Sequence, residues 1–367
     1  MSKNHLSSIK GLDARKAAWE VIQAVGGGSF ADVALERIFN LYSFKSIDKA
    51  LITELSYGAI RQRYYLDCWI DHLGKVPAKK QPPLLRWLLH LGLYQVLKMK
   101  RIPPAAAINT TVELAKTHHL KKLAPVVNGI LRSALRSKER GLLLPKSNNP
   151  SLELAKNESL PVWLAEELIA WKGVEHAQQI AKAFNSVSPI DIRVNKLRAD
   201  LKDVKELFDT CGIQNQLIPN CPSGLEVRAG VGEPRKWPGY EEGKWSVQDR
   251  SSQLIAPLLG PLPGENILDA CAAPGGKSTH IAELMNNEGK IWSVDRSSKR
   301  SKKIFANSER LGINCLKVLV SDSNELLVKH PEWKNFFDRI LIDAPCSGLG
   351  TLARHPDARW RMNRDNI

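Results

Sequence analysis

The residues best suited to chemistry stand in two short loops, each of which directly follows an apolar run. The first loop reads Asp269-Ala270-Cys271-Ala272-Ala273-Pro274-Gly275-Gly276-Lys277-Ser278, and the second reads Asp343-Ala344-Pro345-Cys346-Ser347-Gly348. Glycine permits backbone conformations that other residues avoid. A helix that begins behind such a loop presents free N–H groups and the positive end of its dipole. The first loop therefore predicts a cofactor site.

Three classes of ligand could use the first loop. A P-loop requires G-x-x-x-x-G-K-[ST], and Gly276-Lys277-Ser278 fits its end, but Cys271 stands where the first glycine is needed. The G-x-G-x-x-G pattern of dinucleotide sites is absent. An adenosyl cofactor without a pyrophosphate, such as S-adenosylmethionine, remains, and Asp295 could accept hydrogen bonds from its ribose hydroxyls. A P-loop NTPase is the disfavoured alternative.

The second loop carries a cysteine where enzymes that methylate amino groups typically carry an acid or amide followed by Pro-Pro-aromatic. Carbon 5 of cytosine is a poor nucleophile. A thiolate that adds at carbon 6 makes the ring enamine-like, so that carbon 5 can take a methyl group by covalent catalysis. Cys346 suits thiol chemistry at this place, and Asp343 is positioned to stabilise the adduct near ring nitrogen 3.

The remaining cysteines give no second chemical motif. Cys68, Cys211, Cys221 and Cys315 are expected to be buried and inert. No C-x-x-C spacing occurs, so neither a metal site nor a disulfide framework is expected. Free cysteines suit a reducing cytoplasm. The polar stretch from Met1 to Lys10 lacks the apolar core of a signal peptide.

A parallel sheet would position both loops. Short apolar runs at residues 266–269, 291–295, 316–320 and 339–343 alternate with helical patterns at 277–285 and 299–311, which predicts a doubly wound, Rossmann-like α/β domain. Ligands of such sheets bind at the carboxyl ends of the strands. Asp269, Asp295 and Asp343 fall at such ends, and Asp322 follows another by two residues.

The rest of the chain has a different texture. Residues 1–140 show helical spacing and predict an all-α domain, with the most apolar stretch, residues 83–96, too short for a bilayer and expected to be a buried helix. Residues 141–151 are expected to be a linker and residues 152–255 a small α+β segment. Residues 256–367 form the predicted cofactor-binding domain.

Charge is concentrated at the N-terminal end. The chain has a net charge of +15, and residues 1–150 hold 24 Lys and Arg against 10 Asp and Glu. Such asymmetry favours a module that binds a polyanion, and nucleic acid is the first candidate.

The two loops resemble the signatures of RNA cytosine-5 methyltransferases of the Sun/Nop2 family. Residues 295–297, Arg354-His355-Pro356-Asp357 and Trp360 also look like that family, while residues 107–116 and 127–131 resemble the RNA-binding NusB fold. The resemblance covers essentially the whole chain. A NusB-like domain joined to this catalytic domain is the arrangement of bacterial family members that methylate 16S ribosomal RNA.

This resemblance implies a monomer that acts on 16S rRNA with S-adenosylmethionine and without a metal. The cofactor would be bound by Cys271, Ala272, Ala273, Pro274, Gly275, Gly276, Lys277, Asp295, Asp322 and Asp343. Cys346 would assist release of the methylated base, and the nucleophile would be a second cysteine in a Thr-Cys motif about one strand later. The sequence ends at Ile367 with no Thr-Cys pair after Cys346, so we expect that motif and the last strands of the sheet to be missing.

Two alternatives to this reading stay open. One is an RNA-binding or assembly factor that is catalytically incomplete. The other is a cytosine-5 methyltransferase that acts on transfer RNA.

Overall fold

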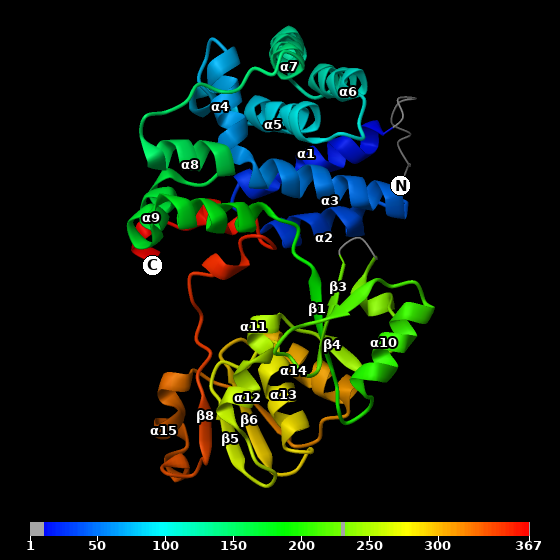
Figure 1. The fold of residues 1–367 in the computed structure, drawn as a ribbon, viewed down its shortest axis with the longest axis vertical. Helices are drawn as coiled ribbons and strands as arrows, with labels where there is room; N and C mark the ends of the chain where they lie inside the picture. The colour runs from blue at the N-terminus through cyan, green and yellow to red at the C-terminus, as the bar shows by residue number, and fades with distance from the viewer. Residues whose placement is uncertain (1–10, 229–231, 367) are drawn as a thin grey trace. The chain divides into compact units, whose positions relative to one another are not determined.

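The computed structural model describes residues 11–228 and 232–366, which fall into two compact units (Figure 1). A helical unit comprises the chain up to Ser186 together with the residues from Ser347 onward, and an α/β unit comprises Val187–Cys346. Residues Met1–Lys10, on which the expectation of no signal peptide rests, lie outside the described residues.

The helical unit confirms the all-α prediction for the N-terminal region. Its N-terminal helices are α1 (Leu12–Gly26), α2 (Ala31–Leu41), α3 (Ser46–Arg61), α4 (Arg63–Leu73), α5 (Pro83–Lys98), α6 (Pro104–Thr117) and α7 (Ala124–Glu139). Helix α5 is the predicted apolar helix, and every residue from Trp87 to Val96 is buried. Over the described stretches of the chain, none of the helices is long and apolar enough to cross a bilayer.

Two further helices extend the helical unit beyond the predicted linker. They are α8 (Pro150–Glu158) and α9 (Val162–Asn185), which bends at Gly173, where φ is +73°. Leu154 of α8 packs with Leu164 and Leu168 of α9 in one buried cluster. The predicted boundaries, with a segment of residues 152–255 and a domain of residues 256–367, stay a prediction, because the compact units divide the chain at different places.

The α/β unit begins with a small antiparallel sheet whose strand order is β2-β3-β1-β4. Its elements are β1 (Ile190–Val194), α10 (Leu201–Thr210), β2 (Asn215–Leu217), β3 (Gly224–Val227) and β4 (Trp245–Val247). Ile192 pairs with Leu225 on one side and with Val247 on the other, so β1 is a central strand. A cluster of aromatic and aliphatic residues around Phe208 and Trp245 forms its core.

A parallel sheet with the order β7-β6-β5-β8 follows, as the sequence predicts. Its elements are α11 (Arg250–Gln253), α12 (Ile255–Leu259), β5 (Asn266–Asp269), α13 (Gly276–Leu284), β6 (Lys290–Asp295), α14 (Ser298–Leu311), β7 (Leu316–Val320), α15 (Leu326–Lys329) and β8 (Arg339–Leu341). Because β5 lies between β6 and β8, the loops after these three strands emerge at one edge of the sheet. The fourth strand is shorter than predicted, and Asp343 lies two residues beyond its end.

A buried charged cluster joins α4 to α5 in the helical unit. The carboxylate of Asp67 accepts hydrogen bonds from Arg86 Nε and from the His90 ring, both at 2.8 Å. Burial by itself would raise the pKa of Asp67, but the hydrogen bonds and charges of His90 and Arg86 outweigh it and lower the pKa to about 2. Burial lowers the pKa of His90, which favours the neutral ring. The pair stabilises the contact only while Asp67 is ionised.

Replacing Asp67 should therefore destabilise α4 and α5 in a pH-dependent way. Asp67→Asn leaves a buried arginine without its counter-ion, and we expect a loss of about 3 kcal/mol near neutral pH. Since the folded pKa lies below the ordinary value of 3.8, the stabilisation is present above about pH 4 and disappears towards pH 2, which is worth about 2 kcal/mol. Hydrogen exchange of α4 and α5 amides in both proteins measures this difference. A gap between them that does not narrow on acidification contradicts the assignment.

Candidate cofactor and catalytic site

The Gly-rich loop between β5 and α13 makes a tight turn that requires glycine. Gly275 has a φ of +100°, and a Cβ atom there would lie 3.1 Å from the Cα atom of buried Ile304. The Gly275 N–H donates to the carbonyl of Ala272 at 2.7 Å, and the Ala272 N–H donates to the carbonyl of Val294 in β6 at 2.8 Å. The turn leads directly into α13, whose first N–H groups have no partner within the helix.

Helix α14 holds the same loop through two side chains. Arg300 donates to the carbonyl of Ala273 at 2.6 Å, and Asn307 donates to the carbonyl of Pro274 at 3.0 Å. Sequence reasoning missed both residues, because nothing in their spacing distinguishes them from other polar residues on an exposed helix face.

The antiparallel sheet reaches the cofactor helix through Arg193 of β1, whose side chain is fully buried. Its guanidinium pairs with Glu283 of α13 at 2.7 Å and donates to the carbonyl of Gly276 at 2.8 Å. It also contacts the side chains of Gln248 and Thr279. Sequence reasoning missed this role, because a charged residue in an alternating strand suggests a solvent face, whereas β1 is buried on both faces.

Asp269 ends β5 and lies almost completely buried at the start of the loop. Its Oδ2 accepts a hydrogen bond from the Ser278 hydroxyl at 2.6 Å, while its Oδ1 makes no hydrogen bond of normal geometry to any described residue. Burial raises the pKa of Asp269 to about 6, against the opposing effects of Ser278 and the Cys271 amide. A buried carboxylate oxygen without a donor indicates a place for a ligand N–H or O–H group.

Asp295 ends β6 and is fixed by backbone contacts. Its Oδ1 accepts from the Ser297 N–H at 2.9 Å, and its Oδ2 accepts from the Ala273 N–H at 3.3 Å. The guanidinium of Arg300 lies 3.5 Å from Oδ2. Because a carboxylate can accept about four hydrogen bonds, the predicted ribose contact leaves this side chain with enough acceptor capacity.

An ion pair connects the two predicted loops. The Lys277 amine of α13 contacts the carboxylate of Asp343, which lies beyond β8. Parallel pairing of β5 with β8, in which Leu268 lies opposite Ile340, brings the two loops to the same edge. Cys346 follows Asp343 by three residues and is exposed, without a hydrogen bond to any part of the described chain.

Cys271 and Asp322 lie at the same loop with different surroundings. Cys271 is half-buried, and burial together with the nearby carboxylates of Asp269, Asp295 and Asp343 raises the pKa of its thiol. Exposed Asp322 caps the short helix Ser323–Glu325 by accepting from the Asn324 N–H at 3.0 Å. The adjacent Ser323 hydroxyl donates to the carbonyl of Ala270.

The other cysteines match their predicted environment only in part. Cys221 and Cys315 are buried and Cys68 is half-buried, but Cys211 is exposed, which contradicts the prediction for that residue. Cys211 follows α10 directly, where the chain turns towards β2. The pair Thr210-Cys211 is a Thr-Cys dipeptide, yet it belongs to the antiparallel sheet region and not to a segment after β8.

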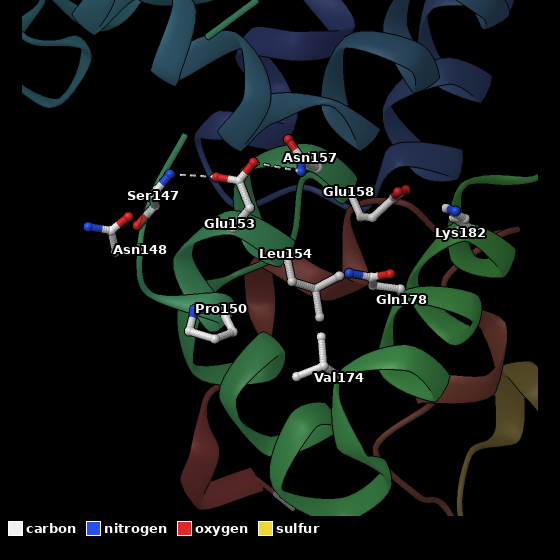
Figure 2. A pocket seen from close by; sticks show the side chains of 10 residues that line it. All are labelled: Ser147, Asn148, Pro150, Glu153, Leu154, Asn157, Glu158, Val174, Gln178 and Lys182. Carbon is white, nitrogen blue, oxygen red and sulfur yellow. Dashed lines mark hydrogen bonds between the residues drawn. The ribbon is translucent and has the colours of Figure 1, made fainter. Parts of the chain in front are cut away.

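Other cavities and metal-binding groups do not add to this site. Figure 2 shows a cavity of about 390 Å³ in the helical unit, between α8 and α9, where Leu154 faces Val174 and where Glu153 accepts from the Ser147 N–H. None of its lining residues is a predicted site residue. Within residues 11–228 and 232–366, no group of three or more His, Cys, Asp or Glu side chains could hold a metal ion.

Comparison with family models divides the chain into three matches. Residues 12–136 match the NusB family, residues 160–232 match the ferredoxin-like domain of RsmF/B-like methyltransferases, and residues 256–367 match the 16S rRNA methyltransferase RsmB/F model. The ferredoxin-like match falls on the antiparallel sheet and part of α9.

Curated relatives and solved structures extend the likeness over most of the chain. The probable ribosomal RNA small subunit methyltransferase B of Synechocystis is 38% identical, over 97% of this chain and 79% of the relative. The corresponding Escherichia coli protein is 37% identical, over 87% of this chain and 71% of the relative. The crystal structure titled PH0851 superposes with a TM-score of 0.76 and 25% identity, over 100% of this chain and 80% of that one.

The Gly-rich and cysteine-bearing loops thus lie on a scaffold whose three parts each match a part of one group of proteins. Because the identity exceeds 30% over more than two thirds of the curated relatives, the chain belongs to the ribosomal RNA small subunit methyltransferase B family.

Proposed function

We propose that this chain methylates carbon 5 of a cytosine in 16S rRNA, with S-adenosylmethionine as cofactor and through a covalent cysteine–cytosine adduct. The observation that carries the proposal is the ion pair between Lys277 and Asp343. It joins the Gly-rich loop of a cofactor site to the loop that carries Cys346. The printed names of the curated relatives support ribosomal RNA as the substrate.

The residues around the first loop fit S-adenosylmethionine. The cofactor would supply the methyl group. Asp295 would accept from the ribose hydroxyls, and the unpaired Oδ1 of buried Asp269 would accept from a donor group of the ligand. The backbone of residues 271–277 would surround the ligand, since the turn at Gly275 has no space for a side chain. Asp322 and Asp343 would complete the site, as the family resemblance implies.

Covalent chemistry on the base requires a thiolate, an acid and a way to release the product. A thiolate adds to carbon 6 of the cytosine, and Asp343 stabilises the adduct by donating a proton to ring nitrogen 3. Carbon 5 takes the methyl group, loses its proton to a base, and the thiol is eliminated from carbon 6. By the family resemblance, Cys346 assists the elimination and a separate cysteine is the nucleophile.

The helical unit would contact the RNA backbone. Its sequence carries most of the positive charge of the chain, and lysine and arginine contacts to phosphates make affinity fall steeply with salt. Action on ribosomal RNA together with free cysteines favours the cytoplasm. We further propose a monomer.

A methyl-transfer assay tests the proposed reaction. Unmodified 16S rRNA and labelled S-adenosylmethionine are given to this chain, to the full product of its gene and to that product with Cys346→Ala. We expect label at carbon 5 of one cytosine from the full product. The Cys346→Ala protein should instead accumulate a covalent protein–RNA adduct, because release of the base is impaired.

Other outcomes of this assay select the alternatives. Methylation of transfer RNA but not 16S rRNA would favour the transfer RNA enzyme. Failure of both unmutated proteins to methylate any RNA, with RNA binding retained, would favour the assembly factor. Turnover by this chain alone would make Cys346 or another residue present here the nucleophile and overturn the release role.

Asp295→Asn should weaken cofactor binding selectively. An amide loses the negative charge and one acceptor atom, and a hydrogen bond to a charged group is worth about 1.5–3 kcal/mol, so we expect the dissociation constant to rise roughly 10- to 100-fold. Calorimetric titration with S-adenosylmethionine measures the change. Asp203→Asn, which removes an exposed carboxylate from α10, is the charge-matched control. Equal affinity of both variants would exclude Asp295 from the cofactor site.

Removal of Arg193 should affect both folding and cofactor binding, and a second variant separates the two. Arg193→Gln leaves buried Glu283 unpaired, which should cost about 3–5 kcal/mol. The double variant Arg193→Met, Glu283→Met removes both charges and should recover most of the melting temperature. It still lacks the contact to the Gly276 carbonyl, so its affinity for S-adenosylmethionine should stay low. Recovery of both properties would mean that Arg193 does not position the loop.

A further inference from the structure

The residues that follow the cysteine-bearing loop belong to the helical unit and not to the sheet. We call residues 349–364 the C-terminal anchor; it contains the short helices Leu349–Thr351 and α16 (Ala358–Arg361). Figure 1 shows this red segment beside the green helix α9. Leu352 is fully buried in the cluster that Leu154 and Leu164 also form. The anchor is therefore part of the hydrophobic core of the helical unit.

Arg359 is the most strongly held residue of the anchor. Its side chain is fully buried, and its guanidinium donates to the carbonyls of Ser159, Phe184 and Leu352 and to the Asn185 side chain at 2.9–3.3 Å. Burial lowers the pKa of Arg359 to about 9. A buried cation whose protein partners are mainly backbone carbonyls requires these carbonyls to stay in place, since an unpaired buried charge is costly.

Asp357 and Trp360 fix the anchor to two other helices. Asp357 is buried and accepts from the N–H of Ala31, the first residue of α2, at 3.3 Å. It thereby caps a helix whose own N-cap residue, Phe30, has no polar side-chain atom. The Trp360 indole donates to the carbonyl of Ile60 near the end of α3 at 2.7 Å.

Three arginine contacts complete the attachment. Arg61 of α3 donates to the carbonyl of Ala353 at 3.0 Å. Arg361 donates to the carbonyl of Gly28 at 2.9 Å, and its guanidinium lies 3.7 Å from the centre of the Phe30 ring. The anchor is thus held at α2, α3, α8 and α9.

The position of the anchor in the chain gives it a consequence for the candidate site. The segment of residues 342–348, which carries Asp343 and Cys346, begins where β8 ends at Leu341 and stops where the anchor begins at Leu349. One end is held by pairing of β8 with β5, and the other is held by the helical unit. So short a connection transmits any displacement of the anchor to Cys346.

We propose that the C-terminal anchor is a positioning element, through which the helical unit holds the Cys346 loop in its reactive arrangement. This inference rests on the proposed methyl transfer. Arg359 and Trp360 act as positioning residues, because they touch neither loop and act through the chain that joins them to Cys346. RNA held by the helical unit and the loop that acts on the base are then coupled through sixteen residues of anchor.

The test uses the full gene product and two variants, Trp360→Phe, which loses only the indole N–H, and the double variant Arg359→Lys, Trp360→Phe. We expect the turnover number on 16S rRNA to fall about tenfold or more in the double variant, because small misplacements of reacting groups are costly. Trp360→Phe alone should lie between it and the parent. Dissociation constants for S-adenosylmethionine and RNA should change less than about twofold, since neither binding surface is touched.

A second readout does not depend on turnover. Iodoacetamide alkylation of exposed Cys346, followed by mass spectrometry, should become several-fold faster in the double variant, while exposed Cys211 serves as the internal reference. Leu131→Ala, a buried change in α7, is the control for lost stability; it should lower the melting temperature without altering either readout below that temperature.

The possible failures are distinguishable. Unchanged turnover and unchanged Cys346 alkylation in a folded double variant would overturn the positioning role. An equal effect of Leu131→Ala would also overturn it, because general destabilisation would then explain the result. A parent without methyl transfer would refute the proposed function, while the alkylation rates would still decide whether the anchor holds the Cys346 loop.

Discussion

The pairing of Arg193 with Glu283 inside the α/β unit is the interaction on which the cofactor loop depends. A fully buried guanidinium is tolerated only when each of its donors finds an acceptor, and here the acceptors come from α13 and from Gln248. The first turn of α13 is consequently held from below by the antiparallel sheet. Asn195 strengthens the same junction by donating to the carbonyls of Gly243 and Leu311. The ferredoxin-like region is therefore a structural part of the cofactor site.

Around this support the loop is surrounded by carboxylates in unequal environments. Asp269 is buried with a raised pKa, Asp295 is fixed by two backbone N–H groups, and Asp343 is half exposed and paired with Lys277. The negative field of these groups keeps Cys271 protonated by raising the pKa of its thiol. It also suits a cofactor that carries positive charge, such as a sulfonium. Two cysteines near one site are thereby given different properties, since Cys346 lies exposed in the other loop.

The sequence predicted the elements well and the long-range contacts poorly. Periodicity placed the strands 266–269 and 316–320 and the buried helix around residues 83–96 where the structure has them, because local spacing and burial determine such elements. The loop residues Asp269, Asp295 and Lys277 were found from strand ends and glycine. Arg193, Arg300 and Asn307 were not, since their partners are backbone carbonyls far away in sequence. The place of residues 347–366 in the helical unit was equally hidden, because their core contacts are made with helices some 170–330 residues upstream.

The helical unit is discontinuous, with the α/β unit inserted between Ser186 and Ser347. Its N-terminal helices leave the ribosome first, but the cap on α2 and the arginine that fills the space near Ser159 arrive only after the whole inserted unit has been synthesised. Contacts of such large sequence separation form late in folding. During translation the N-terminal helices therefore wait in an incomplete state. The helical unit closes only on a chain whose α/β unit is already present, so a product interrupted within that unit lacks the residues that complete the first one.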